Sequence, residues 1–150
     1  MKTYTGKTVD DAVSKACLDL GVTIDQLNYE VTLETKGLFS KKAEIACWTV
    51  EMVQEYIENL IRKILTDMQF EVETVSYVQD GRIYCNINTS NNSILIGKAG
   101  VILRAINLII KNAVSTTFKK RLEVSVDING YKEERYKKLQ VWQDVLVKQF

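Results

Sequence analysis

The spacing of hydrophobic and polar residues predicts a first, short series of elements. Apolar residues recur at helical spacing from Ala12 to Leu20, behind a capping Thr8 and ahead of Gly21. Residues on either side of this helix alternate as strands do. The predicted order is strand, helix, strand and strand, at residues 2–6, 8–20, 29–35 and 43–50. We therefore predict a small β-α-β-β domain over residues 1–48, too small to be robust without help from its neighbour.

A second and longer series begins with the strongest helical pattern in the chain. Apolar side chains from Val53 to Met68 fall on one face, which predicts a core helix. Asp80 and Gly81 are typical of a tight turn between two alternating strands. The predicted elements are helix 49–68, strands 71–78 and 82–90, helical segments 94–96 and 101–114, strand 121–128 and helix 131–150. The chain is thus predicted to be an α+β protein, with an α-β-β-α-α-β domain over 49–130 and a basic amphipathic C-terminal helix over 131–150.

Two glycines three residues apart, Gly97 and Gly100, separate the helical segments that follow the hairpin. Glycine lets a sugar-phosphate backbone come close, because no Cβ stands in the way. A helix N-terminus also presents unpaired N–H groups and a partial positive charge to an anion, and Lys98 adds a full charge at the turn. The other interpretation is a plain turn between two helices, since this spacing alone is weakly specific.

The chain contains no histidine, and this narrows the range of activities. Ser-His-Asp and Cys-His nucleophilic sites and histidine-ligated metal sites are excluded. Carboxylates such as Glu71 and Glu73, or Asp10 and Asp11, lie beside no nucleophile, so we expect no enzyme, no cofactor and no metal site. The isolated cysteines have no CxxC spacing, and we expect them to be small core residues: Cys17, Cys47 and Cys85.

Charge is distributed unevenly along a chain whose net charge is only +1. Residues 1–96 hold 9 basic and 14 acidic side chains, whereas residues 97–150 hold 11 basic and 5 acidic ones. Such asymmetry indicates a polyanion-binding half, although an ordinary solvated surface explains it equally well.

The N-terminus and the apolar stretches bear on localisation. No apolar segment follows Met1, so we expect no signal peptide. The longest apolar stretch, 101–110, includes Arg104 and Asn107 and is too short to span a bilayer. We expect a soluble, cytoplasmic protein without a transmembrane segment.

Element order and the glycine loop together resemble the type II KH domain, a binder of single-stranded nucleic acid. The similarity covers residues 49–128. It implies that Gly97, Lys98, Ala99 and Gly100 clamp the RNA backbone.

The chain as a whole is similar to the Jag family of bacterial proteins, also called SpoIIIJ-associated or KhpB proteins. The similarity rests on TGKTVDDAVSKACLDLGV, KGLFSKKAEI and INGYKEERYKKL, at residues 5–22, 36–45 and 128–139. Family members carry a Jag domain, a KH domain and a C-terminal Arg-x-x-x-His domain. The third domain needs a histidine, so we expect this chain to be a fragment or a short member that lacks it. Loops of this family commonly carry two basic residues, whereas Ala99 here is neutral. This difference should weaken the contact with phosphate.

This resemblance implies a function and partners. It predicts single-stranded RNA binding by an RNA chaperone or post-transcriptional regulator, linked to control of the bacterial cell envelope and cell shape. It further predicts a heterodimer with a small KhpA-like KH protein and a link to a membrane insertase, while a homodimer is the other assembly that we expect for the KH unit.

Further binding residues are predicted from position and charge. The apolar residues before the loop could form part of a groove for unstacked bases: Ile94, Leu95 and Ile96. Two basic residues follow the loop at about one and three helical turns, Arg104 and Lys111, and we expect them to contact phosphates. The basic run 119–121 either tracks phosphates or is a solvated strand entrance.

A protein-interaction adaptor is the alternative function. In that case a degenerate KH unit dimerises, and the terminal helix docks a partner through Trp142, Leu146 and Phe150. Two smaller questions stay open. Tyr84 on the polar face of the hairpin either packs across strands or stacks on a base, and the pair Leu38–Phe39 is either a docking tip or tucked onto its own domain.

Overall fold

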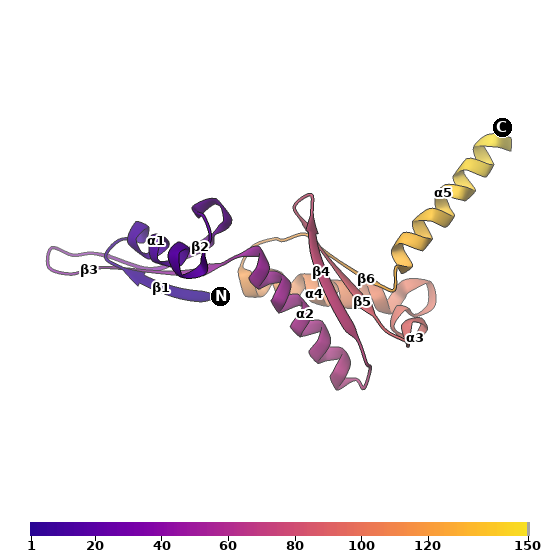
Figure 1. Cartoon of the computed structure of the whole chain (residues 1–150), viewed down its shortest axis with the longest axis horizontal. Helices are drawn as coiled ribbons and strands as arrows, with labels where there is room; N and C mark the ends of the chain where they lie inside the picture. Colours follow the sequence, from indigo (N-terminus) through magenta and orange to yellow (C-terminus); the bar gives the residue numbers. More distant parts are fainter. Residues whose placement is uncertain (150) are drawn as a thin grey trace. The chain divides into compact units, whose positions relative to one another are not determined.

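A computed structural model describes residues 1–149 and contains two compact units, one over Met1–Glu55 and one that begins at Tyr56 (Figure 1). The elements, in order, are β1 (Lys2–Gly6), α1 (Val9–Leu20), η1 (Ile24–Gln26), β2 (Asn28–Lys36), β3 (Lys41–Trp48), α2 (Val50–Asp67), β4 (Glu73–Gln79), β5 (Arg82–Asn88), α3 (Asn92–Ile96), η2 (Lys98–Gly100), α4 (Val101–Phe118), β6 (Val124–Ile128) and α5 (Tyr131–Gln149). The division between the units falls inside α2, so the domain boundary at residue 48 stays a prediction. Phe150, the last residue of the predicted C-terminal helix, lies outside the described residues.

The N-terminal unit is the predicted β-α-β-β arrangement. Its three strands form an antiparallel sheet in the order β1-β3-β2, and α1 packs on that sheet. The amide of Asp11 donates to Thr8 Oγ1 at 3.1 Å, and Gly21 ends the helix with a φ of 66°, as the sequence predicts. Its core consists of Ala12, Val13, Ala16, Leu27, Ile45 and Cys47.

The hairpin of β2 and β3 ends in an exposed tip. Leu38 and Phe39 are 97% and 103% exposed, so the pair does not tuck onto its own domain. The strands that carry it are regular apart from one irregularity between Val31 and Leu33.

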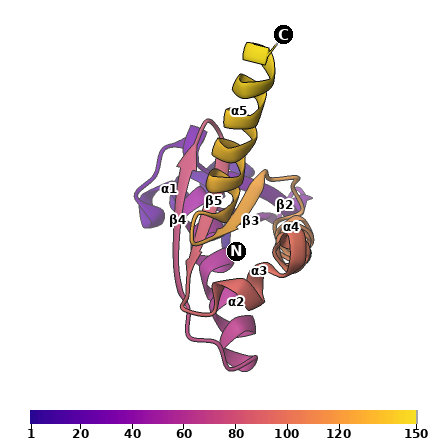
Figure 2. The ribbon, with the colours of Figure 1, turned by 90° about the vertical axis from the view of Figure 1, so that its right-hand side faces the viewer.

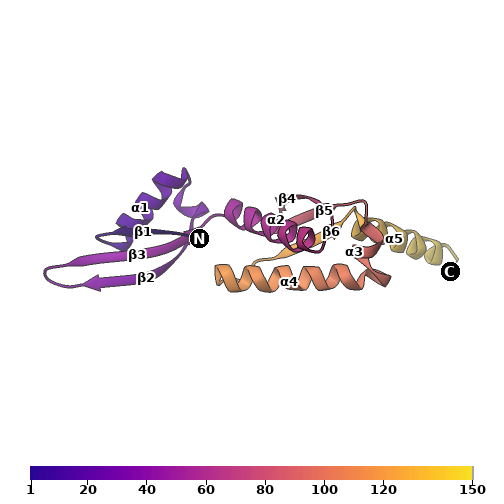
Figure 3. The same cartoon turned by 90° about the horizontal axis from the view of Figure 1, so that it is seen from below.

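The second unit is built on a mixed sheet in the order β4-β5-β6. β4 and β5 are antiparallel, whereas β5 and β6 are parallel. α2 and α4 lie along the same face, where the rings of Tyr56 and Phe118 meet edge to face with centroids 5.4 Å apart (Figure 3). The opposite face carries Tyr77 and Tyr84, and α5 leaves the sheet from the end of β6 (Figure 2). The predicted α-β-β-α-α-β order is therefore present, with α3 as a single short turn.

One helix is longer than predicted. α4 continues to Phe118 rather than residue 114, because Val114 and Phe118 extend its buried face past Leu103 and Ile110. With α3 it forms the segment Asn92–Phe118, which is long and apolar enough to cross a membrane by length and composition. The expectation that the longest apolar stretch is too short to span a bilayer is therefore wrong for this segment, judged by length and composition alone. The segment is interrupted at the glycine loop and contributes part of the domain core.

Cys47 and Cys85 are buried, as predicted, and Cys17 is half-buried at the edge of the N-terminal core. Burial raises the pKa of the Cys47 thiol, and it raises the pKa of Cys85 to about 12. Small buried thiols of this kind are unreactive packing residues. Among residues 1–149, every buried side-chain polar atom has a hydrogen-bond partner.

Candidate nucleic-acid interface

The loop Gly97–Gly100 adopts backbone conformations that favour glycine. Gly97 has φ 74° and ψ 177°, and Gly100 has φ 75° and ψ 20°. The first of these lies in a region that is open essentially to glycine alone. Ala99 between them also has a positive φ of 54°, which is strained for a residue with a Cβ. The loop thus breaks the chain sharply between α3 and α4.

Both glycines are in contact with the protein itself. A Cβ on Gly97 would lie 2.8 Å from Cγ1 of Ile102, and one on Gly100 would lie 3.1 Å from Cε1 of Tyr131. The interpretation that their missing Cβ atoms serve the approach of a ligand is therefore incomplete, because Ile102 and Tyr131 already use that space. The outward face of the loop consists of Lys98 and Ala99, which are exposed.

Internal hydrogen bonds hold the loop in place. The amide of Gly97 donates to the Ser93 carbonyl at 3.0 Å, and that of Gly100 donates to the Gly97 carbonyl at 3.2 Å. Arg104 Nη1 donates to the Ala99 carbonyl at 2.6 Å, from one turn further along α4. The loop is consequently a hydrogen-bonded turn that exposes Lys98 and Ala99.

The three apolar residues of α3 do not share one environment. Leu95 and Ile96 are buried in the core, whereas Ile94 is exposed. Burial follows from the short helix, which must turn one side onto α4 and β6. Of the three, Ile94 alone offers an accessible apolar contact beside the loop.

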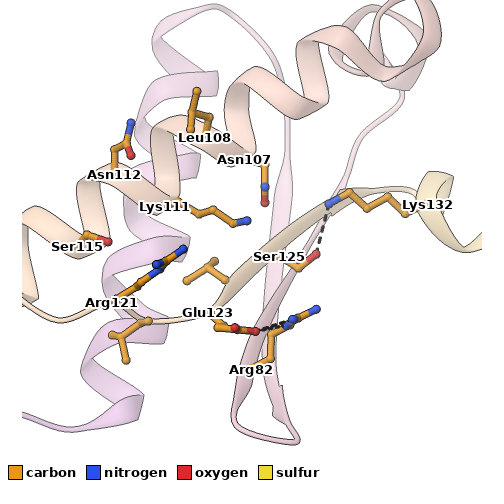
Figure 4. Close-up of a pocket in the computed structure, with 12 residues that line it drawn as sticks. Arg82, Asn107, Leu108, Lys111, Asn112, Ser115, Arg121, Glu123, Ser125 and Lys132 are labelled. Carbon is orange, nitrogen blue, oxygen red and sulfur yellow. Dashed lines mark hydrogen bonds and ion pairs between the residues drawn. The ribbon is translucent and has the colours of Figure 1, made fainter.

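A groove with a hollow of about 370 Å³ lies between α4 and β6 (Figure 4). Lys111 points into it from α4, with Arg121, on the segment that leads into β6, on one side and Lys132, in the first turn of α5, on the other. Lys132 Nζ donates to Ser125 Oγ at 3.3 Å, and burial lowers the pKa of this lysine while Asp127 opposes the effect. These three cationic side chains come from α4, from the segment before β6 and from α5, and Arg82 of β5 lines the same groove.

One carboxylate moderates this positive charge. Glu123 lies in the same groove, and its Oε2 accepts from Nε of Arg82 at 2.9 Å (Figure 4). The hydrogen bond with Arg82 holds the pKa of Glu123 below its usual range and raises the pKa of Arg82. Glu123 thus stays ionised and occupies a guanidinium that would otherwise face the groove.

The floor of the groove is the free edge of the sheet. β6 pairs with β5 alone, so its other edge faces α4. There the amide of Val126 donates to Asn107 Oδ1 at 2.9 Å, and the amide of Ile128 donates to Asp127 Oδ1 at 2.9 Å. An edge strand offers donors and acceptors to any extended ligand, and here side chains already satisfy two of them.

The predicted residues fall into two groups along α4. Arg104 lies with the loop at its start, whereas Lys111 lies in the groove further along. Lys119 and Lys120 follow the end of α4, and of the basic run only Arg121 lines the groove.

Sequence reasoning missed several residues of this surface: Arg82, Asn107, Glu123, Tyr131 and Lys132. A signal existed for Asn107. It lies three residues after Arg104 and four before Lys111, so the three form a polar stripe on an otherwise apolar helix. The others come from β5, the segment before β6, and α5, and nothing in their local sequence places them beside α4.

Comparison with known proteins gives the class of the N-terminal unit and one relative of the chain. Residues 4–47 match the family model for the Jag N-terminus. The N-terminal unit is therefore a Jag N-terminal domain. RNA-binding protein KhpB of Clostridium symbiosum is 29% identical over 146 residues, a match that covers 93% of this chain and 66% of the relative. The chain is thus a distant homologue of KhpB and spans just under two thirds of the length of the relative it matches.

Proposed function

We propose that the second unit binds single-stranded RNA through the loop Gly97–Gly100 and the groove between α4 and β6. The observation that carries the proposal is the convergence of Lys111, Arg121 and Lys132 on a groove floored by a free strand edge. Phosphates bind cationic side chains, and extended single strands expose base edges that can pair with backbone groups. The distant homology to a protein named as RNA-binding supports the same conclusion.

Each part of the surface has its own role in this proposal. Lys98 and the amides at the loop contact one phosphate group, and Arg104 positions the loop through the Ala99 carbonyl. The three groove cations follow the backbone along α4, while Ile94 offers apolar contact beside the loop. The element order supports describing this unit as a type II KH domain, a class that clamps single strands with such a loop.

Binding of a labelled single-stranded RNA, followed by fluorescence anisotropy over a series of salt concentrations, tests the proposal. We expect tighter binding to the single strand than to a duplex of the same sequence, with log affinity falling linearly with log salt. Equal affinity for both forms, or no binding at low salt, contradicts the proposal.

A finer role follows from the family resemblance. As a homologue of KhpB, the protein would act as an RNA chaperone or post-transcriptional regulator, in the cytoplasm and in connection with cell-envelope and cell-shape control. A catalytic role has no place in this proposal. The finer role is tested by sequencing RNA that is cross-linked to the protein in cells and asking whether envelope-related transcripts are enriched.

A specific observation also favours the adaptor function. α4 leaves a row of apolar side chains exposed on the face away from the core: Val101, Ile102, Leu108 and Ile109. Such a stripe is suited to a second helix, from another copy of this chain or from a small KhpA-like KH protein. Sedimentation velocity over a concentration series, with Leu108→Glu for comparison, tests self-association. A wild type that stays monomeric throughout removes the homodimer. The link to a membrane insertase rests on the resemblance alone.

A further inference from the structure

We propose a second RNA contact on the opposite face of the sheet, where the hollow between β4, β5 and α5 stacks a nucleobase on the Tyr77–Tyr84 pair. The proposal rests on the RNA-binding function above and adds a site to it. It gives the single strand a place to continue after it has passed the glycine loop.

The floor of this hollow is an aromatic platform. Tyr77 and Tyr84 are directly opposite in the register of β4 and β5, on the face away from α2 and α4. Their rings are stacked, with centroids 5.1 Å apart and planes 12° apart. The expected cross-strand packing of Tyr84 is thus confirmed. Tyr77 is 43% exposed, so the pair still presents aromatic surface to solvent.

The wall of the hollow is α5, whose first turn is hydrogen-bonded to the end of β6. The amide of Lys132 donates to both carboxylate oxygens of Asp127, at 3.0 and 3.2 Å. This places Tyr136 and Leu139 beside the platform and leaves a cavity of about 760 Å³. A volume of this size holds a small-molecule ligand or a nucleotide.

The charge around the hollow favours a polyanion. Arg82, Arg104, Lys132 and Arg135 line it, against the carboxylates of Asp127 and Glu133. Asp127 is already engaged with the start of α5. Aromatic rings together with guanidinium groups are the combination by which proteins hold single strands without reading their sequence.

The hollow is continuous with the two RNA-binding features already described. Gly100 and Arg104 belong to the loop and also line the hollow. Arg82, Ser125 and Lys132 line both the hollow and the groove between α4 and β6. A strand held at the loop therefore reaches the tyrosine platform without crossing an uncharged surface. This continuity favours RNA over a protein partner as the occupant.

The test compares two oligouridines, one of about four nucleotides and one of about eight, which match the span of a KH loop and of a longer single-strand site. Tyr77→Leu keeps a large apolar side chain on β4 but removes the ring. Tyr77→Phe keeps the ring. Tyr29→Leu is the matched control, because Tyr29 is 42% exposed on a strand of the N-terminal unit.

We expect Tyr77→Leu to bind the shorter RNA as the wild type does and to lose about tenfold in affinity for the longer one. Tyr77→Phe and Tyr29→Leu should bind both RNAs normally. Wild-type affinity of Tyr77→Leu for the longer RNA, equal losses on both RNAs, or a loss in Tyr77→Phe as large as that in Tyr77→Leu would each overturn the stacking site. The first of these results would also leave a protein as the better occupant of the hollow. If the wild type itself binds neither RNA, the proposed function fails, and this site fails with it.

Discussion

Tyr131 fills the space where Gly100 lacks a side chain. Its ring carbon Cε1 lies 3.1 Å from the position that a Cβ on Gly100 would take, and its hydroxyl oxygen lies 3.4 Å from it. α5 is thereby packed against the loop that we assign to RNA, although the two are separated by the whole of α4 and β6. The loop and the start of α5 form one structural unit.

Gly100→Ala tests this packing. The substitution has to tolerate a φ of +75° and also displace Tyr131, so we expect it to be destabilising. Gly81→Ala is the matched control, because Gly81 has a φ of +73° and nothing within 4 Å of its Cβ position. Gly100→Ala should lower the free energy of unfolding in urea by about 1 kcal/mol more than Gly81→Ala does. Adding Tyr131→Ala to the Gly100→Ala variant should remove this extra destabilisation. Equal losses of stability in Gly100→Ala and Gly81→Ala would contradict the packing of Tyr131 against Gly100.

The Asn107 side chain accepts a hydrogen bond from the Val126 amide and so satisfies one donor on the free edge of β6. In Asn107→Asp a carboxylate still accepts that bond, so we expect stability close to wild type, but the new negative charge in the groove should weaken RNA binding about tenfold. Asn107→Leu leaves the Val126 amide without its acceptor and should cost about 1 kcal/mol of stability. Anisotropy and urea unfolding measure the two effects. Asn59→Asp, at an exposed position of α2, should change neither, and full RNA affinity in Asn107→Asp would exclude this groove.

Glu123 limits the positive charge of the groove by occupying Arg82. Glu123→Gln removes a negative charge and frees the guanidinium, so RNA affinity should rise about threefold and the salt dependence should steepen. The matched control is Glu34→Gln, which breaks the exposed pair of Glu34 with Lys36 in the N-terminal unit. Weaker RNA binding by Glu123→Gln would show that the ion pair orders the groove rather than masking it.

The three cysteines should differ in reactivity. At pH 8 we expect iodoacetamide to label Cys17, which is half-buried, while Cys47 and Cys85 stay unlabelled until urea exposes them. Burial raises the pKa of Cys85 from 9.0 to about 12. Between pH 9 and pH 12 the folded state therefore keeps a proton on this thiol that the unfolded state loses. The contribution of this thiol to the free energy of unfolding is fully present below pH 9 and is lost as the pH rises toward 12. Mass spectrometry of the labelled protein measures the order in which the three cysteines react. Labelling of Cys85 as fast as Cys17 at pH 8 would contradict the expected order.

The local sequence pattern by itself predicted the helices and strands and the position of the glycine loop. The period of the apolar residues located each helix and strand, and Gly97 and Gly100 marked the turn between α3 and α4. The same pattern did not predict the groove. Arg82 and Lys132 line the groove beside α4 only because β5 pairs with β6, and local sequence does not show that pairing. Leu95 and Ile96 show a related limit. Their apolar character fits both a base-binding surface and a core, and only tertiary packing distinguishes the two.

The central claim is that RNA binds at the loop and the groove beside it. The most direct measurement is the anisotropy of a labelled single-stranded RNA with the wild type and with Lys98→Asp plus Ala99→Asp, after circular dichroism has confirmed that both are folded. Ser40→Asp plus Lys41→Asp changes the net charge equally at the tip of the N-terminal hairpin and serves as the control. We predict a loss of about tenfold or more in the loop variant, or roughly 1.4 kcal/mol, and little change in the control. Equal affinity in the wild type and the loop variant would contradict the claim.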